Sequence, residues 1–271
     1  MTDSKNFGDQ SRWNTHFGQD ALAELKAAPQ EWLIENRPVN YTVQSLLDSL
    51  PSLDGMNVLD FGSGQGWQSI AIARTGATVT GVDIGEDLVE LARQVAELNK
   101  TECSFQLASV TDLPFEDDTF DVVIGNAILH HLTEDQLAES IREAFRVLKP
   151  GGKAYVNEPI ENSSAFDAVQ NLLPVGERGD SQYRPSILQR KEWKVFLEHQ
   201  DHRALTDKEL RQAGSQFADI SIVYSGWLAR LDRVVPVGAF KNFTSWADTY
   251  LSHGKSPVRR LSRMALVEYT K

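Results

Sequence analysis

A cluster of glycines beside a carboxylate is the first feature whose residue types and spacing indicate chemistry. Gly62, Gly64 and Gly66 follow Asp60 in the order Asp-Phe-Gly-Ser-Gly-Gln-Gly. Glycines let a ligand approach the backbone closely, and the N-terminus of a helix that follows adds N–H donors. The loop therefore predicts a binding site for a nucleotide-like cofactor, with Asp60 at its edge.

The spacing of these glycines separates the kinds of nucleotide site. A dinucleotide fingerprint has the pattern G-x-G-x-x-G, but here the third glycine comes one residue early and Trp67 occupies its place. A phosphate-binding P-loop would continue with Gly-Lys-Ser or Gly-Lys-Thr, and this loop does not. The pattern disfavours both a nicotinamide enzyme and a P-loop protein.

A second carboxylate, Asp83, stands at the end of the next apolar run. Ligands of open α/β sheets bind at the carboxyl ends of the strands, and a carboxylate there can accept hydrogen bonds from both hydroxyls of a ribose. The alternative is that Asp83 only caps the helix that begins near Glu86. The first interpretation makes it the main polar anchor of the cofactor.

The elements that must position these residues follow from an alternation of short apolar runs with helical periodicity, which is typical of a parallel sheet with crossover helices. A capping box, Thr133 with Gln136, marks one helix start, and Thr206 with Glu209 marks another. The predicted strands are 57–61, 78–83, 103–108, 120–125, 153–157, 220–224 and 264–269, and the predicted helices are 67–74, 86–99, one that starts at 133 and ends at the Lys-Pro-Gly-Gly of 149–152, and 206–217.

Composition and charge exclude several classes. The 271 residues are 41% hydrophobic and 24% charged, and the net charge of −11 disfavours a nucleic-acid partner. No apolar run approaches the roughly 20 residues of a membrane span, and the polar start does not resemble a secretory signal, so we expect a cytoplasmic protein. The single cysteine, Cys103, is predicted to be a buried apolar side chain without chemistry.

Length allows one α/β domain over 1–271 with an N-terminal arm, 1–50, and two helical insertions, 160–205 and 227–263, that are too long for ordinary connections and are predicted to form a lid over the substrate. The second insertion holds seven basic residues against two acidic ones, which indicates either an anionic substrate or a solvated face. Three side chains of the arm fall on one side of a possible helix and are expected either to close the cofactor site or only to pack. They are Trp13, His16 and Phe17.

Four motifs in this order resemble the class I S-adenosylmethionine-dependent methyltransferases, in particular the branch with ubiquinone and menaquinone biosynthesis enzymes. They are Val-Leu-Asp-Phe-Gly-Ser-Gly-Gln-Gly at 58–66, Gly-Val-Asp at 81–83, Asp-Leu-Pro-Phe-Glu-Asp-Asp-Thr-Phe-Asp-Val-Val at 112–123 and Arg-Val-Leu-Lys-Pro-Gly-Gly at 146–152. The resemblance implies a Rossmann-like, seven-stranded, mostly parallel sheet with helices on both faces and a reversed final hairpin.

The resemblance also implies the cofactor, S-adenosyl-L-methionine, and its contacts. The glycine loop would lie under the cofactor, Asp83 would bind its ribose and Ile84 would pack on its adenine. Relatives often have an acidic residue beside the adenine amino group, where this chain has Ser109 and Val110, with Asp112 as the other candidate. Asn126, at the end of the fourth strand, would lie beside the methionine part.

Methyl transfer to a hydroxyl or an acidic carbon needs a group that removes a proton. His130 and His131 follow the fourth strand at the cofactor edge, and histidine titrates near neutrality. We favour His131 as the base; the alternative is that one or both only pack before the helix at Thr133. Glu158, just past the fifth strand, is a further candidate base or orienting group, with a plain loop contact as the alternative.

Three functions remain open. The first is methylation of a small molecule, with oxygen as the expected acceptor atom and nitrogen or carbon as alternatives. The second is a regulatory protein that binds the cofactor without turnover, and the third is an RNA or protein methyltransferase, which the acidic balance disfavours. No metal is expected, because Glu198, His199 and His202 have no further ligands at recognisable spacing. The sequence does not indicate an oligomeric state.

Overall fold

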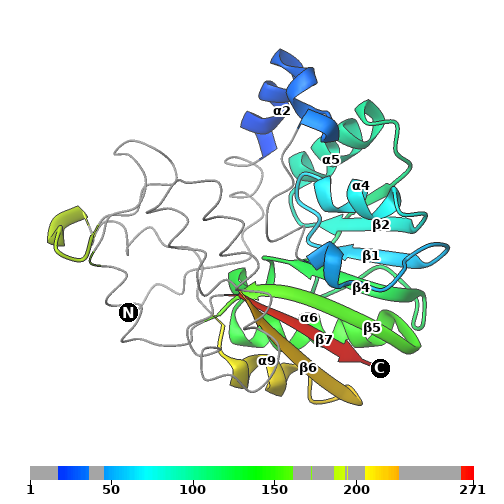
Figure 1. The fold of residues 1–271 in the computed structure, drawn as a ribbon, viewed down its shortest axis with the longest axis vertical. Helices are drawn as coiled ribbons and strands as arrows, with labels where there is room; N and C mark the ends of the chain where they lie inside the picture. The colour runs from blue at the N-terminus through cyan, green and yellow to red at the C-terminus, as the bar shows by residue number, and fades with distance from the viewer. Residues whose placement is uncertain are drawn as a thin grey trace. The chain divides into compact units, whose positions relative to one another are not determined.

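Seven strands form one sheet in the order β3-β2-β1-β4-β5-β7-β6 (Figure 1). The computed structural model describes residues 18–36, 46–160, 172, 186–192, 194, 205–225 and 264–271. The strands are β1 Asn57–Phe61, β2 Thr78–Asp83, β3 Ser104–Leu107, β4 Phe120–Asn126, β5 Leu148–Pro159, β6 Asp219–Ser225 and β7 Met264–Thr270. The prediction of a seven-stranded, Rossmann-like sheet is confirmed.

The first five strands are parallel to one another. β1 pairs with β2 and β4, β2 pairs with β3, and β4 pairs with β5. A parallel sheet needs apolar strands because helices cover its faces, and four of the five β1 residues are buried. Strand order reverses between β1 and β4, and the crevice outside the carboxyl ends at such a reversal is where open α/β folds bind their ligands.

β7 runs opposite to β5. The last residue of the chain, Lys271, accepts a hydrogen bond from the Gly151 backbone N–H and donates its own N–H to the Gly152 carbonyl. The end of β7 therefore lies beside the beginning of β5, which is an antiparallel arrangement. The sheet is thus mostly parallel with a reversed strand near one edge.

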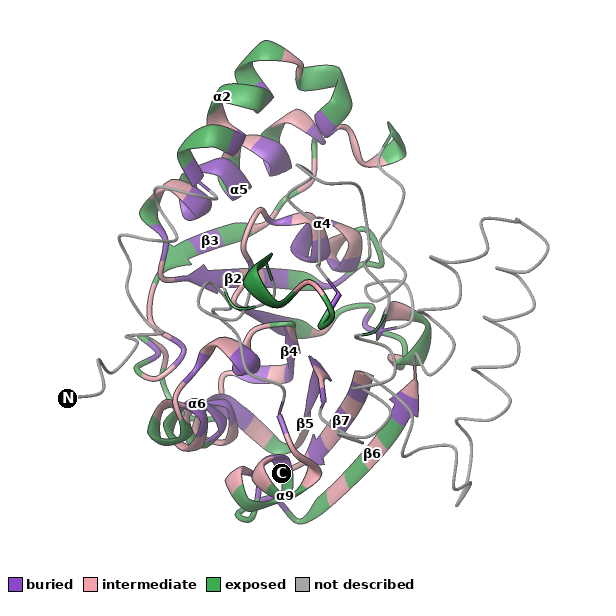
Figure 2. Cartoon of the chain, turned by 90° about the vertical axis from the view of Figure 1, so that its left-hand side faces the viewer, coloured by how far each residue is buried: buried purple, intermediate pink, exposed green. Residues whose placement is uncertain are grey.

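The helices α4, Trp67–Ala73, and α5, Glu86–Leu98, pack on the sheet with their apolar sides (Figure 2). The α5 residues that the sequence places on the inner side are all buried or half-buried. These α5 residues pack in one cluster with Ile70 and Phe105. They are Leu88, Leu91, Ala92, Val95 and Leu98. This packing fixes the loops that precede both helices.

α6, Glu134–Val147, begins at the predicted capping box, in which Thr133 Oγ1 accepts from Gln136 N and Gln136 Oε1 accepts from Thr133 N. The helix stops at Val147, two residues before Lys149, and β5 begins at Leu148, five residues earlier than the predicted start at Lys153. The Pro-Gly-Gly segment does not form a turn, since Leu148 pairs with Phe120 and the glycines pair with Lys271.

The bounds of β3 and α9 also differ from the predicted ones. β3 starts at Ser104, so Cys103 precedes the strand and is half-buried; burial raises the pKa of its thiol to about 12. α9, Asp207–Ala213, ends four residues earlier than predicted. Gly214 follows it where the chain passes the Tyr269 ring so closely that a Cβ would overlap the ring atoms. Glycine both ends this helix and permits that approach.

The described part of the N-terminal segment contains α2, Gln19–Ala27, and the short helices η2, Pro29–Trp32, and η3, Ile34–Asn36. Buried Trp32 stacks on Trp67, with 5.6 Å between the ring centroids. Asn99 holds the segment on α5, because its carboxamide accepts from Ile34 N and donates to the Trp32 carbonyl. Trp13, His16 and Phe17 lie outside the described residues.

Contacts divide the chain into two compact units. The first comprises residues 1–158, 208–221 and 266–271, and the second comprises 159–207 and 222–265. The second unit contains both of the segments that the sequence predicts as insertions, and most of it lies outside the described residues. No helix in the described part of the chain is both long and apolar enough to cross a membrane.

Candidate functional site

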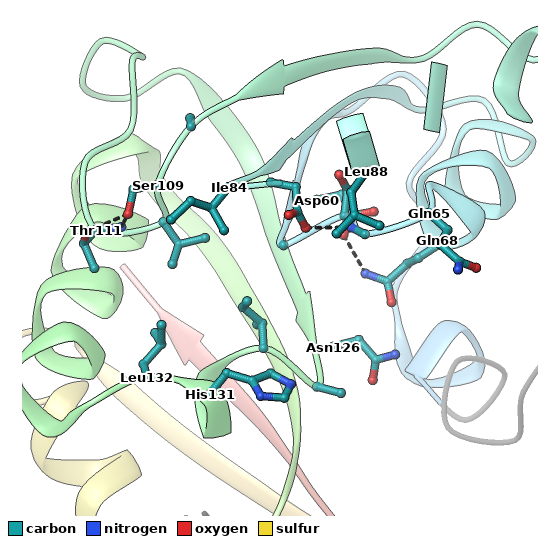
Figure 3. Close-up of a pocket in the computed structure, with 18 of the residues that line it drawn as sticks. Asp60, Gln65, Gln68, Ile84, Leu88, Ser109, Thr111, Asn126, His131 and Leu132 are labelled. Carbon is teal, nitrogen blue, oxygen red and sulfur yellow. Dashed lines mark hydrogen bonds between the residues drawn. The ribbon is translucent and has the colours of Figure 1, made fainter. Parts of the chain in front are cut away.

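A cavity of about 320 Å³ lies in the first unit, at the carboxyl ends of β1, β2 and β4 (Figure 3). This volume is in the range of small-molecule sites. Among the described residues that line it, two are carboxylates, one is histidine and none is lysine or arginine. The lining residues are Asp60, Gly62, Ser63, Gly64, Gln65, Trp67, Gln68, Asp83, Ile84, Leu88, Ala108, Ser109, Val110, Thr111, Asn126, Ala127, Ile128, His131, Leu132 and Gln136.

The glycine loop is tied to the second carboxylate. Asp83 Oδ2 accepts from Gly64 N and its Oδ1 accepts from Gly85 N, both at 2.9 Å. The Asp83 residue is only 8% exposed. Burial raises the pKa of this carboxyl, and the two amides and the Ile84 N–H act in the opposite direction. Asp83 therefore joins the glycine loop after β1 to the end of β2 at the cavity. It also accepts from Gly85, the residue before α5, so its position is compatible with a ribose contact and with a contact to the helix start.

Two of the loop glycines differ in their surroundings. Gly64 has φ +50° and a Cβ added there would find no atom within 4 Å, so its backbone borders open space. Gly66 has φ +83°, precedes α4 and is not among the lining residues. A Cβ on Gly66 would lie 2.9 Å from the Ala92 Cβ. Gly66 thus serves the approach of the loop to α5, although the sequence placed it with the ligand.

This contrast predicts unequal losses of stability. Gly64→Ala should lower the free energy of unfolding by about 1 kcal/mol, the cost of a left-handed conformation for alanine. Gly66→Ala should lose roughly 1–3 kcal/mol more, because its methyl group also overpacks the contact with Ala92. Urea unfolding of both variants beside the parent protein measures the difference. Equal losses would contradict the packing assigned to Gly66.

Asp60 is buried at the end of β1 and is held by α4. Its Oδ1 accepts from Gln68 Nε2 at 2.8 Å and its Oδ2 accepts from Ser69 Oγ at 2.5 Å. Burial raises the pKa of the Asp60 carboxyl to about 6, since the two side-chain hydrogen bonds only partly offset desolvation. The cavity therefore contains a negative charge that costs the fold stability at neutral pH.

Asp60→Asn should reveal this cost. A raised pKa means that the fold gains from Asp60 protonation: the contribution is complete below pH 3.8 and is lost as the pH rises through about 6. The variant cannot ionise, so its unfolding free energy should increase relative to the parent by up to roughly 3 kcal/mol between pH 4 and pH 7.5. Other titrations cancel between the two proteins. A stability difference that does not change with pH would contradict the buried charge.

The residues after β2 and β3 form the apolar side of the cavity. Ile84 and Leu88 come from the β2 end, and Val110 comes from the loop after β3. In that loop, the Ser109 and Thr111 hydroxyls lie 2.7 Å apart, and both residues line the cavity. Asp112, the other candidate for the adenine contact, is not among the described residues that line the cavity. The structure thus brings Ile84, Ser109 and Val110 together, and a flat apolar group can be enclosed there.

The turn after β4 holds His131 in the cavity lining. It forms η4, Leu129–His131, and the His130 and His131 rings contact each other at 3.9 Å between centroids, tilted by 39°. His130 and Glu158 do not line the cavity. Glu158 is fully buried, and its Oε2 accepts from His130 Nδ1 at 2.7 Å.

Glu158 also accepts backbone hydrogen bonds at the start of this turn. Its Oε1 accepts from Ile128 N at 2.8 Å and from Leu129 N at 2.7 Å, and its Oε2 lies 3.3 Å from His130 N. The Glu158 carboxylate therefore binds donors of the turn that carries His131, and these hydrogen bonds hold the turn in place. Of the three candidate catalytic residues, only His131 reaches the cavity.

Asn126, the last residue of β4, lines the cavity beside this turn. Its Oδ1 accepts from Asn157 Nδ2 of β5 at 3.0 Å. This bond fixes the carboxamide with its oxygen toward β5. Among the described residues, no group of three or more His, Cys, Asp or Glu side chains is placed to hold a metal ion. Glu198, His199 and His202 lie outside that part of the chain.

Sequence reasoning did not single out several lining residues, among them Ser63, Gln65, Gln68 and Leu132. Gln68 had one usable signal. It is a polar residue eight positions after Asp60 and within the first turn of a helix whose other positions are mostly apolar. A polar side chain on the sheet side of such a helix needs a buried partner, and Asp60 is that partner.

Comparison with known proteins gives matches along most of the chain. A family described as "Methyltransferase domain" matches residues 58–152. A ubiquinone biosynthesis O-methyltransferase of Coxiella burnetii is 34% identical over 189 residues, which is 63% of this chain and 78% of the relative. A protein of the same name from Xanthomonas euvesicatoria is 28% identical over 237 residues, 80% of this chain and 91% of the relative.

Solved structures share the fold. The crystal structure of an S-adenosylmethionine-dependent methyltransferase from Mesorhizobium loti superposes with a TM-score of 0.54 at 19% identity, covering 84% of this chain and 96% of the other. The PH0226 protein from Pyrococcus horikoshii superposes with a TM-score of 0.58 at 17% identity, covering 96% and 94%. At this level of identity the likeness concerns the fold alone.

Proposed function

Because the chain belongs to the class I S-adenosylmethionine-dependent methyltransferases, in the branch of the ubiquinone biosynthesis O-methyltransferases, we propose that it methylates an oxygen atom of its acceptor and that His131 takes the proton. Family membership makes the protein an enzyme whose cosubstrate is S-adenosylmethionine and whose acceptor is a small molecule. The acceptor atom and the base are our inference.

The cavity suits this cosubstrate. The open space at Gly64 allows a ligand to lie against the loop backbone, and Asp83 offers a buried carboxylate nearby. Two carboxylates without lysine or arginine among the described lining residues favour a ligand with positive charge, as a sulfonium has. The pyrophosphate of a nicotinamide dinucleotide would instead meet repulsion. The lining therefore supports a sulfonium nucleoside over a dinucleotide.

Each part of the cosubstrate then has its residues. Asp83 would accept from the ribose hydroxyls, because its carboxylate retains acceptor capacity beside the two amides it already binds. Ile84 and Val110 would enclose the adenine, with the Ser109 hydroxyl near its polar edge. Asn126 would contact the methionine part. Bound S-adenosylmethionine supplies an electrophilic methyl group, so the protein has only to align the acceptor and manage its proton.

The observation that carries the proposal is that His131 lines the same cavity as Asp83 and the glycine loop. A hydroxyl becomes a better nucleophile as its proton passes to a base, and a neutral imidazole nitrogen can take that proton near pH 7. His130 and Glu158 would act on this base indirectly, by holding the η4 turn. This arrangement favours oxygen, whose proton must leave, over a neutral amine.

We assign acceptor choice to segments that lie outside the regular alternation of strands and helices in the sequence. We include the segments 160–205 and 227–263 in the proposal as elements that select the acceptor, and the arm 1–50 as a cover for the cofactor. The seven basic residues of 227–263 favour an anionic small molecule over a neutral one. The net charge of −11 argues against nucleic acid as the acceptor.

A screen of small hydroxylated acceptors tests the proposed function. The purified enzyme is incubated with methyl-labelled S-adenosylmethionine and matched sets of phenols, amines and carbon acids, each with and without a carboxylate. We expect labelled O-methyl products, found by mass spectrometry, with faster turnover for the carboxylated members. Exclusive labelling of amines would overturn the oxygen assignment, and indifference to the carboxylate would overturn the preference for anions.

A further inference from the structure

Gln68 presents a buried hydrogen-bond acceptor that no described residue uses. The residue lines the cavity from α4 and is 8% exposed, and its Oε1 has no hydrogen-bond partner among the described residues. A buried carboxamide oxygen without a donor is costly, and the great majority of such groups are satisfied. The atom therefore points to a donor that the described residues do not supply.

The orientation of this carboxamide is fixed by chemistry. Gln68 Nε2 donates to Asp60 Oδ1 at 2.8 Å, and an ionised carboxylate can only accept. The nitrogen must face Asp60, so the oxygen must face away from it. Figure 3 shows the Gln68 side chain reaching toward Asp60 with its oxygen turned to the side where Asn126 lies.

Asn126 complements this acceptor. Its Oδ1 is held by Asn157 Nδ2, which leaves the amide nitrogen of Asn126 as the group turned to the cavity. One acceptor backed by a carboxylate and one donor thus face the same end of the cavity. An amino acid has the matching pair of groups, an ammonium that donates and a carboxylate that accepts.

We propose that Gln68 Oε1 binds the α-ammonium group of the methionine part of S-adenosylmethionine, with Asp60 providing the negative charge behind it and Asn126 donating to the α-carboxylate. The proposal rests on the cofactor placement of the proposed function and assigns its amino-acid end. The polarity follows from the lining: Asp60 stands behind Gln68, so an ammonium is attracted there and a carboxylate is repelled.

The test separates the amino-acid end from the rest of the nucleoside. S-adenosylhomocysteine carries the ammonium and carboxylate, whereas 5′-methylthioadenosine has the same adenosine and sulfur without them. Calorimetric titration of the parent and of Gln68→Leu with each ligand should show a loss of roughly 10- to 100-fold for S-adenosylhomocysteine. The affinity for 5′-methylthioadenosine should change less than about twofold, since no lost bond involves it.

Gln65→Leu is the matched control. Gln65 also lines the cavity, but its Oε1 accepts from Trp67 Nε1 at 3.2 Å, so the same substitution should not discriminate between the two ligands. Equal weakening of both ligands by Gln68→Leu would overturn the assignment, as would no weakening of either. If the parent protein binds neither ligand, the cofactor placement itself fails, and this result is distinct from a failure confined to Gln68.

Discussion

His131→Gln is expected to reduce turnover by about 100- to 10,000-fold while the affinity for S-adenosylhomocysteine stays within about twofold of the parent. A positioned base contributes in this range, and glutamine keeps the size and polarity of the side chain without its basicity. His131 lines the cavity, whereas the glycine loop is held by the Asp83 carboxylate. The effect should therefore appear in the rate and not in cofactor binding.

Imidazole supplies the control for this substitution. In His131→Ala the lost side chain leaves room, and added imidazole should restore part of the turnover, whereas it should not restore His131→Gln. Steady-state assays with calorimetry on the same preparations measure both quantities. Unchanged turnover would remove His131 from the mechanism, and a loss of cofactor affinity as large as the loss of rate would show that its ring only packs.

Asp83→Ala is expected to weaken S-adenosylhomocysteine binding by about 100-fold, equivalent to about 2.7 kcal/mol. The change removes a buried carboxylate that would accept from the ribose, and it also releases the amides of Gly64 and Gly85 that this carboxylate holds at 2.9 Å. Both losses act on the cofactor because the loop and the ribose contact meet at this side chain. Calorimetric titration measures the difference.

A neighbouring carboxylate separates this effect from a general change of charge. Glu86 is exposed at the start of α5, three residues after Asp83, so Glu86→Ala removes the same charge without the contacts. It should leave the affinity within about twofold. Normal affinity in Asp83→Ala would contradict the placement of the ribose, and an equal loss in both variants would reduce the effect to long-range electrostatics.

Much of the fold could be predicted because strand and helix signals were local. The β1, β2 and β4 runs are apolar and end in turns, and the Thr133 capping box marks the start of α6 within the sequence itself. The start of β5 could not be predicted in this way. Pro150, Gly151 and Gly152 indicate the end of a helix, but Lys271 pairs with both glycines and the strand extends through them.

For the candidate site, the sequence predicted which residues stand at the carboxyl ends of the strands, but not where their side chains point. Position at the carboxyl edge placed Asp83 and His131 near a ligand, and both line the cavity. The same reasoning placed Glu158 at that edge without revealing that its side chain points to backbone N–H groups of the η4 turn. Gln68 was not predicted because a single glutamine in a helix forms no motif. In the structure, its buried hydrogen bond to Asp60 and its Oε1, which has no donor among the described residues, identify it.

Calorimetric titration of the parent protein with S-adenosylhomocysteine, beside a nicotinamide dinucleotide, tests the central claim most directly. The claim is that the cavity between the glycine loop, Asp83 and His131 binds the sulfur nucleoside of a methyltransferase. We predict saturable one-to-one binding of S-adenosylhomocysteine, which the Asp83→Ala substitution weakens, and no binding of the dinucleotide. Absence of binding by the sulfur nucleoside, or saturable binding of the dinucleotide, would contradict the account.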